Sequence, residues 1–222
     1  MIEYFFCFTE TKTKKSYLCS MRLVKPSKIF RMFYPSLLWE MPKTDKKTLY
    51  LTFDDGPHPL ITPKVLEILK KYDAKATFFC IGNNVRKYPE TFKLIKQEGH
   101  SIGCHTFNHE NGWNTKTGDY IKSFNEANEL IHSNLFRPPH GKIKRSQLKQ
   151  LKDKKIVAWT VIAYDWDHAL SHDAVYHNVI KNAYDGAIVA FHDSEKAYNN
   201  MISALPRVLE YYHNQGFEFK AL

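Results

Sequence analysis

The 222-residue sequence has no hydrophobic run that approaches the roughly 18 apolar residues of a membrane-spanning helix. Low-complexity tracts and sequence repeats are also missing. Only four cysteines occur, at Cys7, Cys19, Cys80 and Cys104, and no two of them have C-x-x-C spacing. The sequence therefore indicates neither a structural zinc cluster nor a disulfide framework. With 43% hydrophobic residues, the chain is long enough for one domain with a sizeable core.

The net charge of +9 is concentrated near the start of the chain. Residues 1–48 contain ten Lys/Arg against four Asp/Glu, whereas residues 49–222 contain 22 against 19. We therefore predict a basic N-terminal extension over residues 1–48 and a single domain over residues 49–222. The domain carries little excess charge, so no nucleic-acid partner is expected. A nucleic-acid-binding module built on the extension would instead predict steeply salt-dependent affinity.

The first residues do not have the order of a secretory signal peptide, because a short apolar patch precedes the charges. Residues 1–20 are predicted to be a disordered extension or the product of a mis-set start codon. In the second case the chain would begin at Met21.

From residue 49 onward, strand-like and helix-like segments alternate, which predicts parallel βαβ units. Polar motifs follow five of the expected strands: FDDG, HTFNH, RPPH, YDWD and FHDS. A parallel β/α barrel collects catalytic groups at the carboxyl ends of its strands, whereas an open sheet does so only near a switch point. Because the domain's 174 residues are fewer than the ~250 of a full barrel, we predict a distorted, incomplete (β/α) barrel. The expected strands cover 49–53, 76–82, 101–105, 135–137, 156–164 and 187–193, and the expected helices cover 62–72, 89–99, 118–132, 144–154, 171–184 and 201–214.

The HTFNH motif places His105 and His109 four residues apart. On a turn of helix this spacing puts two imidazoles on one face, where they could hold one ion. A lone H-x-x-x-H is more often two ordinary surface histidines, but a carboxylate from Asp55 or Asp54 would complete a His₂-carboxylate set. Three protein ligands leave a position for water, as in catalytic sites. Zinc is the first expectation, and manganese, cobalt or iron would also accept these ligands.

The two adjacent aspartates then have separate tasks. Side chains alternate along a strand, so one carboxylate can bind the metal while its neighbour takes a proton from a water activated there. The alternative is a solvated turn, because Asp and Gly are common turn residues.

Two further motifs offer groups that could complete a catalytic site. Arg137, in RPPH, suits a charge-assisted and even bidentate hydrogen bond to the basic carboxylate. His192, at the end of an apolar strand, becomes a general acid when Asp165 orients its ring and raises its pKa. An ordinary surface arginine and a structural histidine are the alternatives.

Together and in this order, the motifs resemble those of polysaccharide deacetylases, the NodB-like carbohydrate esterases, from about Thr48 to the C-terminus. The resemblance implies a distorted β/α barrel with a divalent metal. It also implies roles for individual residues: Asp55, His105 and His109 as metal ligands, Asp54 as general base, Arg137 as its tether, Asp165 as the partner of His192, His192 as general acid, the backbone N–H of His140 as an oxyanion donor, and Trp166 and Ala190 near the substrate.

Three positions depart from the family's pattern. His140 stands where tyrosine is usual, Ile162 where an earlier aspartate is common, and Ala190 where leucine is common. The change to Ala190 would widen the pocket for the acetyl methyl group, unless Phe191 or Trp166 compensates.

The resemblance implies a metal-dependent hydrolase that removes N-acetyl groups from amino sugars of a polysaccharide or glycan and releases acetate. The alternative is a carbohydrate-binding protein that has the same fold without catalysis. The expected partner is an N-acetylated glycan. Localisation stays open, because relatives often act outside the cytoplasm whereas no export signal is recognised here.

Overall fold

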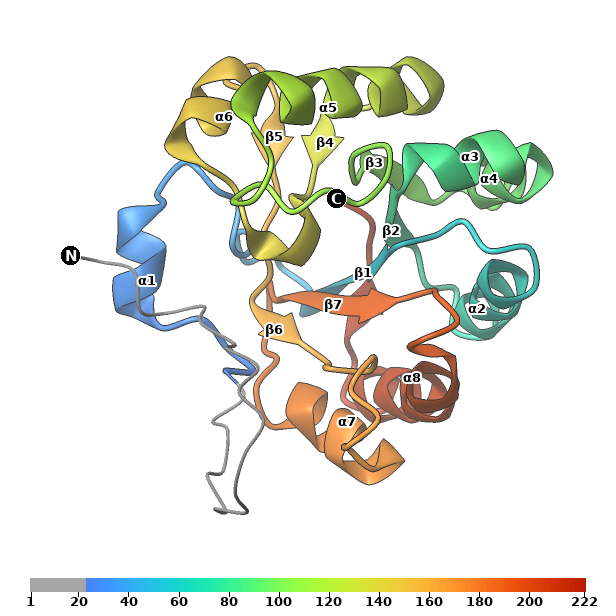
Figure 1. Cartoon of the computed structure of the whole chain (residues 1–222). Helices are drawn as coiled ribbons and strands as arrows, with labels where there is room; N and C mark the ends of the chain where they lie inside the picture. The colour runs from blue at the N-terminus through green and yellow to red at the C-terminus, as the bar shows by residue number, and fades with distance from the viewer. Residues whose placement is uncertain (1–22) are drawn as a thin grey trace, which may run out of the picture.

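The computed structural model describes residues 23–222 (Figure 1). The predictions for residues 1–20 and for a start at Met21 lie outside this range. In the described part of the chain, no helix is long and apolar enough to cross a membrane.

Parallel strands form a curled half-barrel, which is the distorted, incomplete barrel that the sequence predicts. The strand order is β5-β4-β3-β2-β1-β7-β6, and β8 pairs with the beginning of β1. The register between β1 and β7 sets Asp54 directly beside His192. The strands are β1 Thr48–Asp54, β2 Ala76–Cys80, β3 Ser101–Cys104, β4 Leu135–Phe136, β5 Lys155–Ile156, β6 Val161–Ile162, β7 Ile188–His192 and β8 Glu218–Phe219.

Helices surround the outer face of the sheet (Figure 1). α7 and α8 pack against each other, and α2 packs on α8 and α4. Proline at residue 89 suits the first turn of α4, where its missing N–H costs no hydrogen bond. The helices are α1 Lys28–Phe33, α2 Ile61–Lys70, α3 Gly82–Lys87, α4 Pro89–Gln97, α5 Thr117–Ile131, α6 Arg145–Gln150, α7 His172–Ile180 and α8 Tyr198–His213, with a 3₁₀ turn at Pro139–Gly141.

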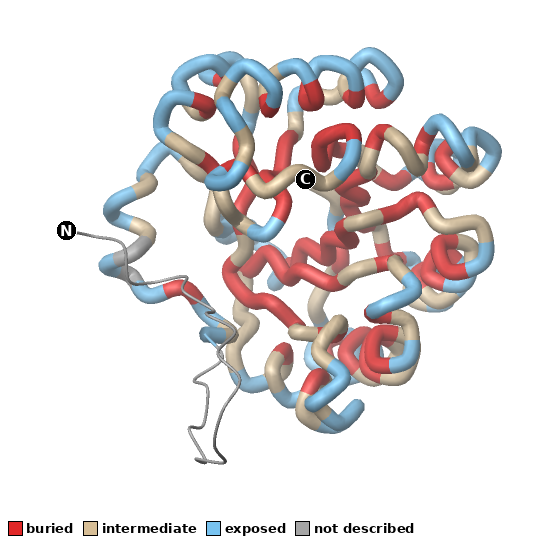
Figure 2. Tube along the Cα trace, viewed as in Figure 1, coloured by how far each residue is buried: buried red, intermediate tan, exposed pale blue. Residues whose placement is uncertain are grey.

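The core lies between the sheet and these helices, and buried residues follow the central strands (Figure 2). Every residue of β1 is buried, as expected for a parallel strand covered on both faces. Phe53 stacks between Phe78 and Phe191, with ring centroids 5.0 and 6.0 Å away. The strand that ends at Asp54 is therefore held in the packed core.

The expected strand over residues 156–164 is wrong, because the chain forms two short strands, β5 and β6, that are separated at Trp159. The two halves change neighbours: Val157 N–H donates to Phe136 O in β4, whereas Thr160 N–H donates to Ile188 O in β7. A continuous apolar run does not reveal such a change of partner. The polar helix α3 was also not predicted, since its six residues have little apolar periodicity.

Residues 23–41 lie between the two ends of the curled sheet, beside β5 and β6 (Figure 1). Leu38 N–H donates to Ile156 O, and Ala158 N–H donates to Leu38 O, each at 2.8 Å. At the other end, Ile162 N–H donates to Val24 O at 3.0 Å. This segment thus supplies hydrogen-bond partners to strands that would otherwise end the sheet.

Candidate active site

A cavity of about 350 Å³ opens where the carboxyl ends of the strands meet. Asp54, Asp55, His105, His109 and His192 all line it, although they come from three separate motifs. This location agrees with the rule that loops at the carboxyl ends of parallel strands build the site.

Asp54 ends β1 and is held by the fully buried Arg137. Arg137 Nη1 donates to Asp54 Oδ1 and to Thr52 Oγ1, both at 2.7 Å. Nη2 donates to Ala158 O at 2.8 Å. The contact with the carboxylate uses one guanidinium nitrogen and is not bidentate. Burial lowers the pKa of the Arg137 guanidinium, and the Asp54 carboxylate partly offsets this.

Asp55 turns in a different direction because its backbone leaves the strand with a φ of 79°. This left-handed conformation is tolerated by aspartate better than by most residues. Asn84 Nδ2, from α3, donates to the carbonyl oxygen of Asp55 at 2.8 Å and fixes the turn. The neighbouring carboxylates therefore face different partners, but the backbone turn at Asp55 separates them and not the alternation along a strand.

His105 and His109 come together on a loop, not on the helical turn that their spacing suggested. The loop follows β3, and Thr106 and His109 have φ values of 60° and 62°. Two left-handed residues reverse the chain tightly and bring the imidazole centroids to 5.0 Å from each other. The spacing thus predicts the proximity but not the backbone conformation.

The Asp55, His105 and His109 side chains form a possible metal site, with ligand atoms within 4.8 Å of one another. His109 Nε2 and His105 Nε2 lie 3.2 and 3.7 Å from Asp55 Oδ1. That oxygen is buried and has no hydrogen-bond partner among the described residues. A buried carboxylate oxygen without a partner is costly, and a cation between it and two imidazoles would satisfy it. This donor set fits a divalent transition metal such as zinc.

The protonation of His105 suits a metal ligand. Its Nδ1 lies 2.6 Å from Arg137 O, a contact in which Nδ1–H donates and Nε2 keeps a lone pair towards Asp55. Burial lowers the pKa of His105 to about 4 and keeps the ring neutral at neutral pH. Burial alone would raise the pKa of Asp55, but the neighbouring histidines, His192 first, lower it below its usual value.

The half-buried His192, at the end of β7, pairs with the fully buried Asp165 in the loop after β6. His192 Nδ1 lies 2.9 Å from Asp165 Oδ1, and His192 N–H donates to Asp165 Oδ2 at 2.8 Å. Asn200 Nδ2 donates to Asp165 O at 3.1 Å and anchors the loop to α8. Burial opposes the charged ring, but the Asp165 carboxylate raises the pKa of His192 to about 9.

The remaining predicted positions surround the same cavity to different degrees. Trp166 lines it, and its ring lies 4.5 Å from that of His192. The His140 side chain also lines it, next to His109 at 4.4 Å between ring centroids. Ala190 is buried inside β7, in register with Ile162 of β6, and Ile162 rather than Ala190 is among the cavity-lining residues.

Several cavity residues were not predicted from the sequence. Leu23 and Pro26 reach the cavity from the N-terminal segment, and no local pattern indicates this. Trp159 belongs to the apolar run for which a single strand was expected. Tyr164, Ser194 and Lys196 flank motifs that were recognised.

Asp193, directly after His192, is a second unpredicted feature of this region. Its carboxyl group is fully buried beneath Gly56, and Oδ2 accepts from Thr62 Oγ1 at 2.5 Å. Burial, followed by the nearby Asp55 carboxylate, raises the pKa of Asp193 to about 8. The Asp193 side chain thus packs against the loop that contains Asp55 and Gly56.

The strand ends of this half-barrel bring together a His₂-carboxylate set, an arginine-bound aspartate and a His–Asp pair. Metal-dependent hydrolases use groups of these kinds. The family model for polysaccharide deacetylase matches residues 41–159, more than half of the chain. The chain belongs to this family.

Several relatives with similar sequences are peptidoglycan deacetylases by name. A peptidoglycan-N-acetylglucosamine deacetylase of Bacillus cereus is 33% identical over 187 residues, which cover 80% of this chain and 68% of the relative. The peptidoglycan-N-acetylmuramic acid deacetylase PdaA of Bacillus subtilis is 35% identical over 81% of this chain and 71% of its own length. The crystal structure of the Bc1960 peptidoglycan N-acetylglucosamine deacetylase has a TM-score of 0.80 and 31% identity, covering 87% of this chain and 94% of that one.

Proposed function

We propose that this protein is a divalent-metal-dependent hydrolase that removes N-acetyl groups from the amino sugars of peptidoglycan. The observation that carries the proposal is the buried, unpartnered Oδ1 of Asp55 facing the Nε2 atoms of His105 and His109. The names of the relatives, which act on N-acetylglucosamine or N-acetylmuramic acid in peptidoglycan, support the choice of substrate.

In this proposal Asp55, His105 and His109 hold the cation, which would act as a Lewis acid on the acetamide oxygen and on a water. Asp54 accepts a proton from the attacking water. Arg137 orients the Asp54 carboxylate through its 2.7 Å hydrogen bond. The backbone N–H of His140 donates to the developing oxyanion.

The carbon–nitrogen bond then breaks, and the nitrogen needs a proton to leave as an amine. His192 supplies it, because Asp165 keeps its ring protonated up to about pH 9. The products are acetate and a free amino sugar, and the water is consumed. Trp166 packs against the His192 ring and restricts its orientation.

The test is acetate release from peptidoglycan glycan strands and from N-acetylglucosamine oligomers, with zinc, manganese, cobalt or iron supplied. Asp54→Asn should reduce the rate by about 10²–10⁴-fold without loss of bound metal. His105→Ala should lose both metal and activity. Asp119→Asn, a change in α5, is the control and should alter neither.

Full activity of Asp54→Asn under matched metal loading would refute the assigned roles. Glycan binding without acetate release under any metal would favour the alternative, a carbohydrate-binding protein of this family that has no catalysis.

A further inference from the structure

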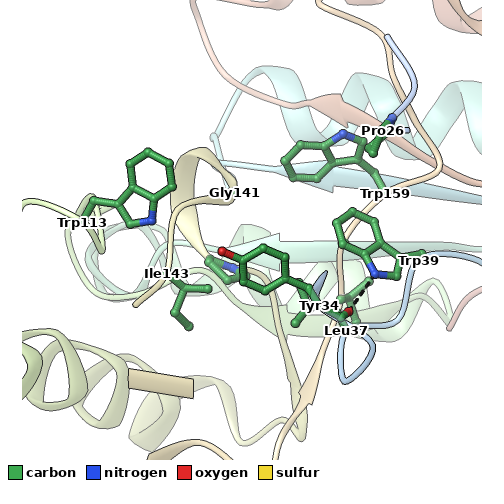
Figure 3. A pocket seen from close by; sticks show the side chains of 11 residues that line it. Pro26, Tyr34, Leu37, Trp39, Trp113, Gly141, Ile143 and Trp159 are labelled. Carbon is green, nitrogen blue, oxygen red and sulfur yellow. Dashed lines mark hydrogen bonds between the residues drawn. The ribbon is translucent and has the colours of Figure 1, made fainter. Parts of the chain in front are cut away.

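An aromatic groove lies beside the candidate active site. Tyr34, Trp39, Trp113 and Trp159 contribute their rings to it (Figure 3). Trp113 is 40% exposed, and the other three rings are half-buried. Three of the four tryptophans in the sequence therefore gather at one place on the surface.

The groove is built from two parts of the chain that are far apart in sequence. Tyr34 and Trp39 come from the N-terminal segment, which lies outside the residues matched by the family model. Trp113 follows the metal-ligand loop, and Trp159 separates β5 from β6. The groove thus combines two rings from the N-terminal segment with two rings from within residues 41–159.

Hydrogen bonds hold Trp39, and close packing against Gly141 holds Trp159, before any ligand arrives. Trp39 Nε1 donates to Tyr34 O at 3.0 Å, and Thr160 Oγ1 donates to Trp39 O at 2.7 Å. Gly141 has a φ of 67°, and a Cβ atom there would lie 2.5 Å from the Trp159 ring. Such a preformed surface loses little conformational entropy on binding.

The groove is continuous with the catalytic cavity. Pro26, Pro138, Gly141 and Trp159 line both. A polymer whose acetamide group occupies the cavity must leave it in some direction, and this wall leads directly onto the aromatic rings. The position therefore suits the neighbouring part of the same ligand.

The chemistry of the groove favours a sugar ring as its occupant. A pyranose has an apolar face of C–H groups, which packs well on the electron-rich face of tryptophan or tyrosine. The enclosed space between the side chains is about 30 Å³, which is room for one water molecule. A sugar would therefore lie across the rings and would not enter between them.

We infer that Tyr34, Trp39, Trp113 and Trp159 form a second sugar-binding subsite that stacks a neighbouring pyranose of the glycan strand being deacetylated. The identity of this ligand rests on the proposed function. The subsite makes the protein favour long glycan strands over short oligomers, because only a long strand fills the cavity and the groove together.

The test compares binding of N-acetylglucosamine dimer and hexamer by calorimetry, in an Asp54→Asn background that prevents turnover. The hexamer should bind more tightly than the dimer. Trp113→Ala and Tyr34→Ala should weaken hexamer binding by about five- to tenfold and dimer binding much less. Tyr34→Phe retains the ring and should bind like the background protein.

Tyr211→Ala is the matched control, because it removes a ring of similar exposure, 38%, from α8. It should change neither affinity. Thermal unfolding of each variant tests its folding, and Trp113 is exposed enough for its alanine variant to fold even where Tyr34→Ala does not.

Equal affinity for dimer and hexamer, equal losses on both ligands, or no binding of either would overturn the subsite. Acetate release by the chain with native Asp54 is measured separately. If the chain with native Asp54 releases acetate but Trp113→Ala does not change hexamer binding, the subsite is refuted and the proposed function is not. A hexamer preference that depends on Trp113, without acetate release from any substrate, refutes the proposed function and retains the subsite.

Discussion

Replacing Asp165 by asparagine should move the alkaline limit of activity to lower pH. The carboxylate lies 2.9 Å from His192 Nδ1 and raises the pKa of His192 from its usual 6.5 to about 9. Asparagine has nearly the same shape and can still accept from His192 N–H. Its other atom is an NH₂ group that donates to Nδ1, which disfavours the protonated ring.

The size of the effect follows from the fraction of protonated His192. At pH 8 a pKa of 9 leaves about nine-tenths of the rings protonated, whereas a pKa of 6.5 leaves about 3%. If His192 is the general acid, Asp165→Asn should lose about 30-fold in kcat/KM at pH 8 and much less at pH 5.5. The alkaline limb of the pH profile should shift by about two units or more.

The assay is acetate release from an N-acetylglucosamine oligomer between pH 5 and pH 10 at saturating metal. Asp173→Asn removes an exposed carboxylate that pairs with Arg207 on α8, and it should leave the profile unchanged. An Asp165→Asn profile that keeps its alkaline limb near pH 9 would refute the general-acid role of His192.

The same pair predicts a pH-dependent contribution to stability. The pKa of His192 is higher in the folded protein than in the unfolded chain, so the pair stabilises the fold fully below about pH 6.5. This stabilisation is lost as the pH rises through about 9, and it is on the order of 3 kcal/mol. The unfolding free energy of the wild type, relative to Asp165→Asn, should therefore decrease over this interval.

Two further changes test the support behind the site. Arg137→Met should lower the free energy of unfolding by about 3–5 kcal/mol in urea titrations, because it leaves the Asp54 carboxylate buried without a partner; a loss below about 1 kcal/mol would contradict this. Asp193→Asn should raise the thermal midpoint at pH 8 but not at pH 4, since a carboxyl group whose pKa is raised to about 8 makes the folded state lose stability as pH rises between these values. The same gain at both pH values would show that Asp193 is not buried at an electrostatic cost.

The sequence predicts the barrel and the meeting of its motifs because each motif directly follows an apolar run. The meeting of FDDG, at the end of β1, with FHDS, at the end of β7, follows from the rule that parallel strands have their carboxyl ends on one side. The prediction of proximity for Asp54 and His192 is confirmed by their register in neighbouring strands. The catalytic and ligand roles of these residues stay predictions.

What the sequence could not provide depends on long-range pairing and on local backbone conformation. The break at Trp159 arises because β5 and β6 have different neighbours, which no local pattern encodes. The loop from His105 to His109 uses left-handed residues that are not glycine, so the spacing was read as helical. The hydrogen-bond partner of the buried Asp193 is Thr62, which lies 131 residues earlier in the chain.

The placement of residues 23–41 has a consequence for how this protein can be shortened. A fragment that starts at residue 49 would uncover the amide and carbonyl groups of Ile156, Ala158 and Ile162 that now pair with this segment. Strand edges with unpaired N–H and C=O groups can pair with the strand edge of another molecule, so such fragments should associate with one another. The same truncation would remove one wall of the cavity. Residues 23–41 therefore both complete the sheet and shape the entrance to the site.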